Sequence, residues 1–401
     1  MRIAIFSGYP YPMSLEEPLR CGGQYGPFFL SRALASLGHE VHVICRGRKG
    51  DEKHQKLDGV DVHRYHSYSH IGGTRQSMSL SLHRLVLFIK LVERYEFDVI
   101  NAQTPIVFES FVAKRKHLPI VYISQGVIGM YAKNLSMSAR DLLNKMAMRF
   151  LSIPAAKHTF RKCDKILGVA KDDVMKIAEH FKIKQDKLAL IHNGVDLSRF
   201  NTQVDAGGIR AKYKLDGKNV ILFLGRLHPH KGVHNIIEAA PSVIRDFPNS
   251  IFLIVGVVDS PGYQKELAKR IFNSRLDSHI RIINDVSERQ KPEYYRAADM
   301  SIIFSEGYDP APNTIIESMA CGLPIISVDF PARYEKIKHG INCLMVPEGD
   351  VDGLAKAIKK LLSEKDYARV MGELNYKMAR YNYDARFAAE RFVELVKNIS
   401  K

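Results

Sequence analysis

The sequence of 401 residues contains no tryptophan, only five cysteines and no long apolar run. The cysteines are widely separated and form no Cys-x-x-Cys pair, which argues against a disulfide framework or a zinc site and suits a reducing compartment. The longest stretch without a charged side chain lies between Lys116 and Lys133 and contains proline and glycine, so we expect no transmembrane helix. The opening residues are broken too soon for the apolar region of a signal peptide. We therefore expect a cytoplasmic protein that at most contacts the inner face of a membrane.

Acidic residues are scarce relative to basic ones, 43 against 59, and the formal net charge is +16. The excess lies mainly in the first half, where residues 1–200 carry a net +12 and residues 201–401 a net +4. Such an excess suits nucleic acid, anionic lipid or a phosphorylated substrate. The lack of tryptophan, of a recognisable nucleic-acid module and of aromatic residues between the basic ones argues against nucleic acid.

Short apolar runs alternate with amphipathic segments, the pattern of doubly wound parallel sheets. The first half has predicted strands at Ile3–Ser7, Val41–Cys45, Val60–His63, Val99–Ala102, Ile120–Ile123 and Ile166–Val169, and predicted helices at Phe28–Leu37, Ser81–Arg94 and Ser138–Arg161. The second half has predicted strands at Val220–Leu224, Phe252–Val255, Arg281–Ile283, Met300–Phe304, Ile325–Val328 and Cys343–Val346, and predicted helices at Val233–Val243, Tyr263–Asn273, Pro292–Ala298, Thr314–Ala320 and Val351–Ser363. We predict an α/β protein with two Rossmann-like domains, 1–195 and 196–380, followed by a C-terminal helix in 381–401 whose packing partner the pattern leaves open.

Ligands of open α/β sheets bind beyond the carboxyl ends of the strands, so the loops there are the candidate sites. The segment Gly225–Gly232 follows a buried strand and carries two cations five residues apart, Arg226 and Lys231. An arginine fork and a lysine point charge suit a pyrophosphate, which must be held and have its charge offset as it departs. Two solvated loop cations would give the same pattern.

The segment 305–324 runs from a strand end through a proline-rich loop into a helix that begins near Asn313 and Thr314. The free backbone N–H groups at the start of a helix form an anion site. Glu317 can accept paired hydrogen bonds from a ribose diol, and Asp309 can do the same for sugar hydroxyls. A turn role for Asp309 and a helix-dipole role for Glu317 are the alternatives.

Gly22 and Gly23 follow the first strand, and paired glycines allow a backbone to approach a ligand closely. A flexible turn would look the same.

Taken in order, these segments resemble glycosyltransferase family 4, the retaining, nucleotide-sugar-dependent enzymes with the two-domain GT-B fold. The family's motifs are similar to Gly22-Gly23, to Asn-Gly-Val-Asp at 193–196, to the Gly225-Arg226 and Lys231-Gly232 pairs and to the helix at 317–324. The resemblance covers most of the chain.

The resemblance implies two Rossmann-like domains that face each other across a cleft, with the acceptor on the first and the donor on the second. Arg226 and Lys231 would bind the donor pyrophosphate and Glu317 the ribose, in a hexosyltransferase-type reaction that retains the anomeric configuration. The leaving phosphate would assist removal of the acceptor's proton. No metal and no cofactor besides the nucleotide-sugar substrate is implied. Asp350-Val351-Asp352 mimics a metal-binding Asp-x-Asp, but it precedes a helical pattern and is predicted to be a cap.

Two positions depart from the family pattern. Asp309-x7-Glu317 stands where the family has Glu-x7-Glu, and Glu306 has the wrong spacing to replace Asp309. Many members have a histidine after the strand that ends here at Ile123, whereas this chain has Gln125, which can form hydrogen bonds but cannot act as an acid or base at neutral pH.

Three other functions remain open: a nucleotide-sugar epimerase on the same fold, a sugar phosphorylase, and a catalytically silent homologue that binds a nucleotide-sugar without transferring it. The acceptor could be a glycan, a glycolipid or a small-molecule hydroxyl.

Much of the basic excess lies on the acceptor side: Lys114, Arg115, Lys116, Lys133, Arg140, Lys145, Arg149, Lys157, Arg161 and Lys162. The helix predicted at Ser138–Arg161 could place Leu142, Leu143, Met146, Phe150 and Leu151 on one face. One hypothesis is peripheral contact with an anionic membrane that gives access to a lipid-linked acceptor. A buried core helix with solvated cations is the alternative.

Overall fold

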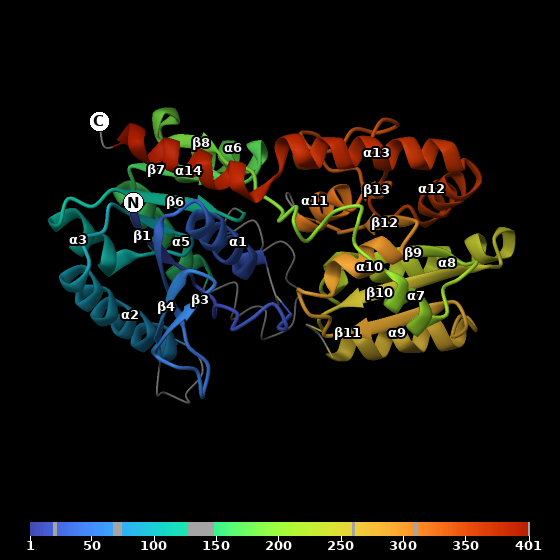
Figure 1. Ribbon diagram of the computed structural model, residues 1–401, viewed down its shortest axis with the longest axis horizontal. Coiled ribbons are helices and arrows are strands. Elements are labelled where there is room, and N and C mark those ends of the chain that lie inside the picture. Colours follow the sequence, from blue (N-terminus) through green and yellow to red (C-terminus); the bar gives the residue numbers. More distant parts are fainter. Residues whose placement is uncertain are drawn as a thin grey trace. The chain divides into compact units, whose positions relative to one another are not determined.

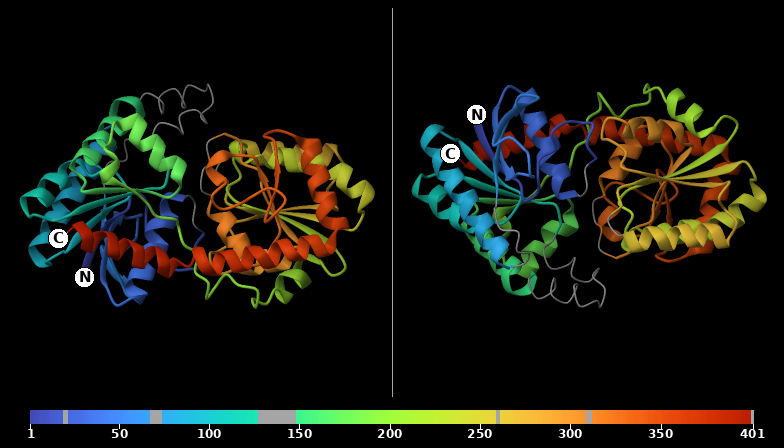
Figure 2. Two further views of the ribbon diagram at one scale, coloured as in Figure 1. Left: turned by 90° about the horizontal axis from the view of Figure 1, so that it is seen from above. Right: turned by 90° about the horizontal axis from the view of Figure 1, so that it is seen from below.

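The computed structural model describes residues 1–18, 22–66, 74–126, 148–258, 261–307, 309 and 312–399, and divides the chain into two compact units (Figure 1). Unit 1 comprises Met1–Ser14, Cys21–Gly194 and Ala385–Lys401. Unit 2 comprises Leu15–Arg20 and Val195–Asp384. Each unit is built on one sheet with helices on both sides (Figure 2).

The sheet of unit 1 has the strand order β3-β4-β2-β1-β5-β6-β7-β8 among the described residues. Its strands are β1 (Arg2–Phe6), β2 (Glu40–Arg46), β3 (His54–Leu57), β4 (Val60–Tyr65), β5 (Val99–Ala102), β6 (Ile120–Ser124), β7 (Lys165–Gly168) and β8 (Leu188–Leu190). Its helices include α1 (Gly22–Ser36), α2 (Thr74–Arg94), α3 (Val107–Arg115), η2 (Met148–Ser152), α5 (Ile153–Lys162), α6 (Lys171–Phe181), η3 (Gln185–Lys187) and α14 (Ala385–Ile399).

An antiparallel hairpin at one edge of this sheet departs from the predicted alternation. β3, which was not predicted, pairs antiparallel with β4, whereas the other pairs in the sheet are parallel. The turn is Asp58-Gly59, with φ of +48° and +83°. Asp-Gly with two positive φ angles is the preferred two-residue hairpin turn, so this signal was present in the sequence.

The sheet of unit 2 is entirely parallel in its described pairs and has the order β11-β10-β9-β12-β13-β14. Its strands are β9 (Asn219–Leu224), β10 (Ser250–Gly256), β11 (Ile280–Asn284), β12 (Met300–Ile303), β13 (Ile325–Val328) and β14 (Leu344–Val346). Its helices include α7 (Gly207–Tyr213), η4 (Pro229–Lys231), α8 (Val233–Asp246), α9 (Pro261–Asn273), α10 (Lys291–Ala297), α11 (Asn313–Ala320), η5 (Pro331–Arg333), α12 (Val351–Ser363) and α13 (Lys365–Asn382).

Both faces of this second sheet are buried, as its near-continuous apolar strands predict. Along β9, Ile221 and Phe223 point into a core shared with α8, α9 and α12. Val220, Leu222 and Leu224 point into a second core with α7, α10 and α11. Polar chemistry is thereby confined to the ends of the strands.

The unit boundaries differ from the predicted domains in two places. Leu15–Arg20 groups with unit 2 rather than with the rest of 1–195, because the main-chain N–H of Arg289 donates to the carbonyl of Leu15 at 2.8 Å. The final helix α14 groups with unit 1, where it packs against α1. The crossing lies at Asp384–Ala385 rather than near 380, since the carbonyl of Tyr383 still accepts from Val195 N in unit 2 at 2.7 Å.

None of the helices within the described ranges is long and apolar enough to cross a membrane. Of the helix predicted at Ser138–Arg161, the structure describes η2 and α5, which begin at Met148. The basic residues Lys133, Arg140 and Lys145 and the apolar residues Leu142, Leu143 and Met146 of that prediction lie outside the described residues.

Replacing Gly256 by alanine should lower the free energy of unfolding, because the added Cβ would lie 1.6 Å from the carbonyl oxygen of Gly225. The backbone must then shift, at a cost of about 1–3 kcal/mol. Gly208→Ala is the matched control, since nothing lies within 4 Å of its added Cβ. Alanine in α7 should be neutral or stabilise by up to about 1 kcal/mol. Urea unfolding measures both, and equal stabilities would contradict the close approach.

Candidate active site

The loop after β9 carries the two predicted pyrophosphate ligands, Arg226 and Lys231. Arg226 is half-buried and Lys231 ends the short helix η4. The next residue, Gly232, has a φ of +65°, and a Cβ there would lie 2.1 Å from the carbonyl oxygen of Phe304. Only glycine therefore lets this loop pass against the end of β12. That passage places Lys231 beside the loop that follows β12.

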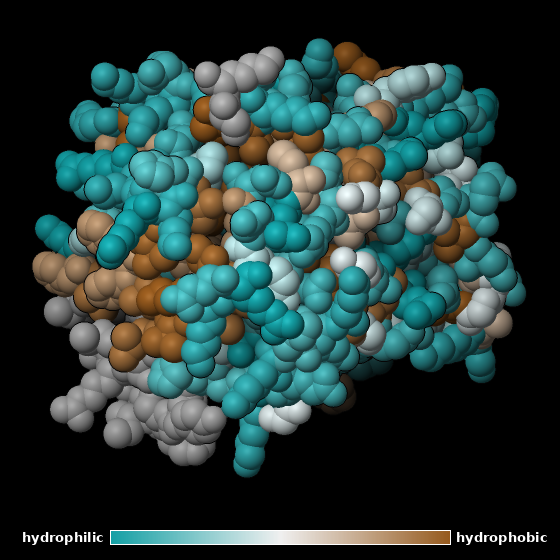
Figure 3. All heavy atoms as spheres, turned by 60° about the vertical axis from the view of Figure 1, so that its left-hand side comes forward, coloured by the Kyte–Doolittle hydropathy of each residue, from teal (hydrophilic) through white to brown (hydrophobic). Residues whose placement is uncertain are grey.

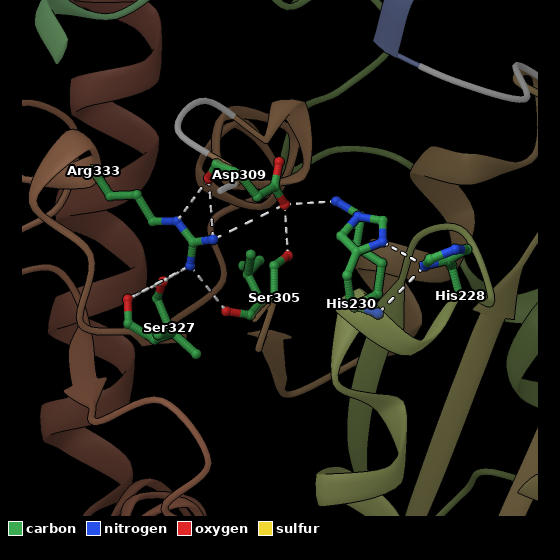
Figure 4. Close-up of polar contacts among 9 residues, drawn as sticks. His228, His230, Ser305, Asp309, Ser327 and Arg333 are labelled. Carbon is green, nitrogen blue, oxygen red and sulfur yellow. Dashed lines mark hydrogen bonds and ion pairs between the residues drawn. The ribbon is translucent and has the colours of Figure 1, made fainter. Parts of the chain in front are cut away.

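An ion pair joins the two loops. The ammonium of Lys231 lies 2.5 Å from Oδ2 of Asp309, and both side chains are about 15% exposed, at 15% and 16% (Figure 4). The hydroxyl of Ser305 donates to the same carboxylate oxygen at 2.6 Å. A main-chain bond from Glu306 N to the carbonyl of His230, at 2.7 Å, runs alongside. The structure thus brings together two residues that the sequence proposed separately, and in the state described Asp309 is held by protein donors.

Arg333 is a third member of this cluster, and the sequence reasoning missed it. It lies in η5 after β13, its side chain is 0% exposed, and its Nε and Nη2 donate to the main-chain carbonyl of Asp309 at 3.3 and 3.2 Å (Figure 4). Nη2 also lies 3.9 Å from the Asp309 carboxylate. No local pattern in the sequence marks this arginine, because its partner is 24 residues away.

The cluster has an excess of positive charge, because two cations share one carboxylate. Burial by itself would raise the pKa of Asp309, but Lys231 and Arg333 outweigh it and hold that pKa well below its ordinary value. Burial lowers the pKa of the neighbouring His230 to about 3, so its ring is neutral at physiological pH. His230 and His228 lie with their Nδ1 atoms 2.6 Å apart. Such a cluster is suited to an anionic group.

Glu306 contacts the helix that follows the loop after β9. Its carboxylate accepts from Nδ2 of Asn235 at 2.5 Å and lies 3.3 Å from Nε2 of His234. Both partners belong to the first turn of α8. Glu306 therefore ties the loop after β12 to that helix.

Glu317 lies on α11 in a polar cluster beneath the surface. Its side chain is 1% exposed, and the hydroxyl of Tyr295 donates to Oε2 at 2.7 Å. Burial raises the pKa of Glu317, against the opposing charge of Lys291. Lys291 in turn lies 2.5 Å from the buried carboxylate of Glu288. The carboxylate is thus oriented by neighbours on α10, which the sequence did not indicate.

Asn313 and Thr314 form the first turn of α11 and are half-buried. The preceding residue, Pro312, provides no side-chain cap. Gly225 stands directly after β9, with its N–H donated to the carbonyl of Val255 at 2.9 Å. The carbonyl of Gly225 lies close to Gly256. A side chain is therefore excluded at Gly256 rather than at Gly225.

The Gly22-Gly23 loop was predicted wrongly, because both glycines lie in the first turn of α1. The first N–H groups of a helix have no intrahelical partner, so glycine costs less there than in a helix interior. A Cβ at Gly23 would lie 2.2 Å from the ring of Tyr9, so the glycine accommodates a side chain of this unit.

Gln125 lies in unit 1 within a network of amide side chains. Its Oε1 accepts from Nδ2 of Asn193 at 2.9 Å, and its Nε2 donates to Gln103 at 3.3 Å. A Cβ on Gly26 would lie 2.1 Å from that Nε2. The pocket beside them has a volume of about 30 Å³, room for about one water molecule. Gln125 thus contacts the Asn193-Gly194 segment, after which the chain passes from unit 1 into unit 2.

Asp350 caps α12, as predicted, by accepting from Gly353 N at 2.8 Å. Within the described residues there is no group of three or more His, Cys, Asp or Glu side chains that could hold a metal ion.

The depressed pKa of Asp309 predicts a pH-dependent stability. Its charge stabilises the fold above the unfolded pKa of about 3.9, and this contribution is lost as the pH falls toward the lower pKa of the folded state. Asp309→Asn should therefore be about 3 kcal/mol less stable near neutral pH, because Lys231 and Arg333 lose their carboxylate. Denaturant unfolding should show that the difference in the free energy of unfolding between the wild type and Asp309→Asn narrows below about pH 4.

The control for this measurement is Asp366→Asn, whose side chain is 97% exposed beside Arg369. It should cost less than about 1 kcal/mol at every pH. A stability difference between the wild type and Asp309→Asn that does not change with pH would contradict the depressed pKa of Asp309.

Both halves of the chain are similar to known glycosyltransferases. The family model for glycosyl transferases group 1 matches residues 207–378, and the model for glycosyltransferase family 4 matches residues 28–199. The chain is 26% identical over 231 residues to spore coat protein SA of Bacillus subtilis, covering 55% of this chain and 61% of that one. It is 26% identical over 376 residues to an uncharacterized glycosyltransferase of Methanocaldococcus jannaschii, covering 91% and 90%.

Sucrose-phosphate synthase from Thermosynechococcus elongatus has a similar structure, with a TM-score of 0.81 and 18% identity over 99% of this chain and 98% of that one. This likeness shows the fold. The two family models follow one another along the chain and match the two sheets in turn. The chain therefore belongs to glycosyltransferase family 4, the group 1 glycosyltransferases, and is an enzyme of the GT-B fold.

Proposed function

We propose that this enzyme is a retaining glycosyltransferase that moves a sugar from a nucleotide-diphosphate-sugar to a hydroxyl group of a glycan, a glycolipid or a small molecule. The observation that carries the proposal is the cluster of Lys231, Asp309 and Arg333 at the carboxyl ends of β9, β12 and β13. Ligands of such sheets bind at these ends. Cations beside a carboxylate suit a substrate that combines a diphosphate with sugar hydroxyls.

In the proposed reaction, the bond from the anomeric carbon to the donor phosphate breaks and a bond to the acceptor oxygen forms on the same face. The acceptor's proton passes to the leaving phosphate. Arg226 and Lys231 offset the charge that develops on that phosphate. Because Asp309 neutralises part of the Lys231 charge, the second cation of the cluster, Arg333, keeps the local charge positive.

Asp309 and Glu317 are the proposed donor-sugar and ribose ligands, with the first turn of α11 at Asn313 and Thr314 facing a phosphate. Oδ1 of Asp309 is the oxygen proposed to accept from a sugar hydroxyl, because the contacts that the structure describes with Lys231 and Ser305 both use Oδ2. For Glu317 to bind the ribose, its carboxylate must accept hydrogen bonds from the ribose hydroxyls as well as from Tyr295.

The proposed chemistry uses no metal. It favours transfer over epimerisation, since Gln125 cannot move a proton and its amide is engaged with Gln103 and Asn193. We propose a cytoplasmic location, which the four described cysteines suit because they are free and buried.

A panel of UDP, GDP, ADP and CDP, each with and without its sugar, should contain one donor that raises the melting temperature. A ligand at about 100 times its Kd adds about 2.7 kcal/mol. With that donor, Lys231→Ala should lower kcat by about 10²–10³-fold, because a charge on the leaving group is no longer offset. Glu317→Ala should weaken donor binding by about tenfold or more. The anomeric configuration of the product, read by NMR, should match the donor's.

Lys359→Ala serves as the control, because Lys359 pairs with Asp246 on the outside of unit 2 and should not affect turnover. A chelator should leave the rate unchanged. Binding without transfer or hydrolysis would instead identify a silent homologue, and an altered free nucleotide-sugar would identify an epimerase.

We also propose peripheral contact of unit 1 with an anionic membrane, through an apolar patch on α2, α3 and η2. Its members are exposed by 37–64%: Leu82, Val86, Ile89, Phe108, Phe111, Phe150 and Leu151. Exposed apolar side chains gathered on adjacent helices mark an interaction surface. Figure 3, which brings the side with α2 and α3 forward, shows hydrophobic surface on this flank.

The charges around the patch favour an anionic lipid surface over an apolar protein partner. The basic side chains on α2, α3, η2 and the following helix α5, or directly after α3, include Lys90, Arg94, Arg115, Lys116, Arg149, Lys157, Arg161 and Lys162. The ammonium of Lys162 lies 5.3 Å from the centre of the Phe111 ring. Of the carboxylates described on the same helices, Glu109 is buried against Arg84 and Glu93 is exposed. Apolar side chains with a basic rim suit an anionic interface.

Sedimentation with phosphatidylglycerol vesicles should carry the full-length protein down, whereas phosphatidylcholine vesicles should not. Phe108→Asn with Phe111→Asn should abolish most of the binding. Arg115→Gln with Lys116→Gln should weaken it about thirtyfold, at about 1 kcal/mol for each charge. Phe272→Asn is the matched control, because Phe272 is 74% exposed on α9 of unit 2 and should not affect binding. Equal binding to both vesicles at low salt would overturn the membrane proposal.

A further inference from the structure

The guanidinium of Arg333 is fully buried, so the free-energy cost of burying its charge must be offset by the groups that it contacts. Burying a charged group is unfavourable unless its donors are paired. The Nη1 group donates to the Ser327 hydroxyl at 2.9 Å and, at longer distance, to the carbonyls of Ile303 and Val328 at 3.4 and 3.5 Å. Ile303 and Val328 are the last residues of β12 and β13. One edge of the guanidinium is therefore fixed to two adjacent strand ends.

The other edge of the guanidinium holds Asp309. Nε and Nη2 both donate to its main-chain carbonyl, and Nη2 lies 3.9 Å from its carboxylate. The segment from Phe304 to Pro312 contains no helix or strand among its described residues. Arg333 thus ties an irregular loop to the end of the sheet and at the same time places a positive charge behind the Asp309 side chain (Figure 4).

A lysine could not do this, because its donors project from a single atom. The planar fork of arginine is needed to reach the strand ends on one side and the carbonyl of Asp309 on the other. Asp309 also has a shorter side chain than the glutamate of the family pattern. Holding its backbone toward the sheet fixes where that short carboxylate can reach.

We propose that Arg333 is a positioning residue for the donor sugar, which sets the place and the charge of the Asp309 carboxylate through its fork of hydrogen bonds. The proposal rests on the proposed function, because it gives Asp309 a sugar to bind. Lys231 contacts the same carboxylate from the loop after β9, whereas Arg333 contacts it from η5, which follows β13.

Among the described residues, the ionisable groups around Asp309 lie on η4 and η5. Lys231 and His230 face it from η4, and Arg333 faces it from η5. Arg226 acts on Lys231, while Cys343 and Glu348 act on Arg333. Because Lys231 and Arg333 are the charges that lower the pKa of Asp309, loss of Arg333 should raise that pKa, whereas a lysine at the same position should keep it low.

The test compares Arg333→Met and Arg333→Lys with the wild type, using the nucleotide-sugar found in the donor panel and kcat/KM measured against pH. Both variants should lose about 10- to 100-fold in kcat/KM for the donor, as expected for a misplaced ligand. In Arg333→Met the acid limb of the profile should also move to higher pH, and in Arg333→Lys it should not. Binding of the free nucleoside diphosphate should weaken much less than kcat/KM falls in both variants.

Further variants guard against a general loss of fold. Ser327→Ala removes the shortest hydrogen bond of the fork and should lower kcat/KM without moving the acid limb. Asp309→Asn keeps the carbonyl that Arg333 holds but removes the carboxylate, so adding Arg333→Met to it should cause no further change with pH. Arg245→Met, at a side chain that is 75% exposed, should match the wild type throughout.

An equal loss of activity at every pH in Arg333→Met, with an unmoved acid limb, would show a purely structural arginine and overturn the proposal. So would free nucleotide binding that falls as far as kcat/KM. A wild-type enzyme that turns over no nucleotide-sugar would instead overturn the proposed function, and this inference with it.

Discussion

The ion pair between Lys231 and Asp309 is the contact on which the candidate site of unit 2 depends. It joins the loop after β9 to the loop after β12, and these two strands are neighbours in the sheet. Because parallel strands end at the same edge, residues 78 positions apart in sequence are brought within 2.5 Å. Opposite charges in a partly dry setting then hold two irregular loops in one arrangement.

The sheet explains why the chemistry gathers at that edge. Both faces of β9 are buried in separate apolar cores, so neither can accept a charged group without cost. The strand ends are the remaining places for polar side chains. Glycines permit the required closeness there: Gly232 lies against Phe304, and Gly256 lies against the carbonyl of Gly225. The close packing at these glycines therefore also fixes where the polar side chains at the strand ends can lie.

Most of the fold could be predicted because parallel sheets leave a strong local pattern. The predicted Val99–Ala102 and Ile325–Val328 agree with β5 and β13 residue for residue, since their bounds are set by apolar runs between charged or turn residues. β3 was not predicted because its sequence, His-Gln-Lys-Leu, is mostly polar, and half of it is exposed at the sheet edge. Helix α13 also escaped, and the Gly22-Gly23 segment was assigned to a loop although the helix already begins there. The Asp58-Gly59 turn beside β3 and the helix-forming residues of α13 are local signals that the pattern of apolar runs did not capture.

The sequence by itself determined the order of most strands and helices, the family, and the candidate residues of the loop after β9 and of α11, because each belongs to a contiguous pattern. Only the tertiary structure decided that Asp309 is paired with Lys231, that Glu317 is buried beside Tyr295, and that α14 packs with unit 1. It alone revealed Arg333, which reads in the sequence as one more basic residue among 59. The physical reason is that burial and charge pairing depend on which segments the sheet sets side by side, and that proximity leaves no trace in the local pattern.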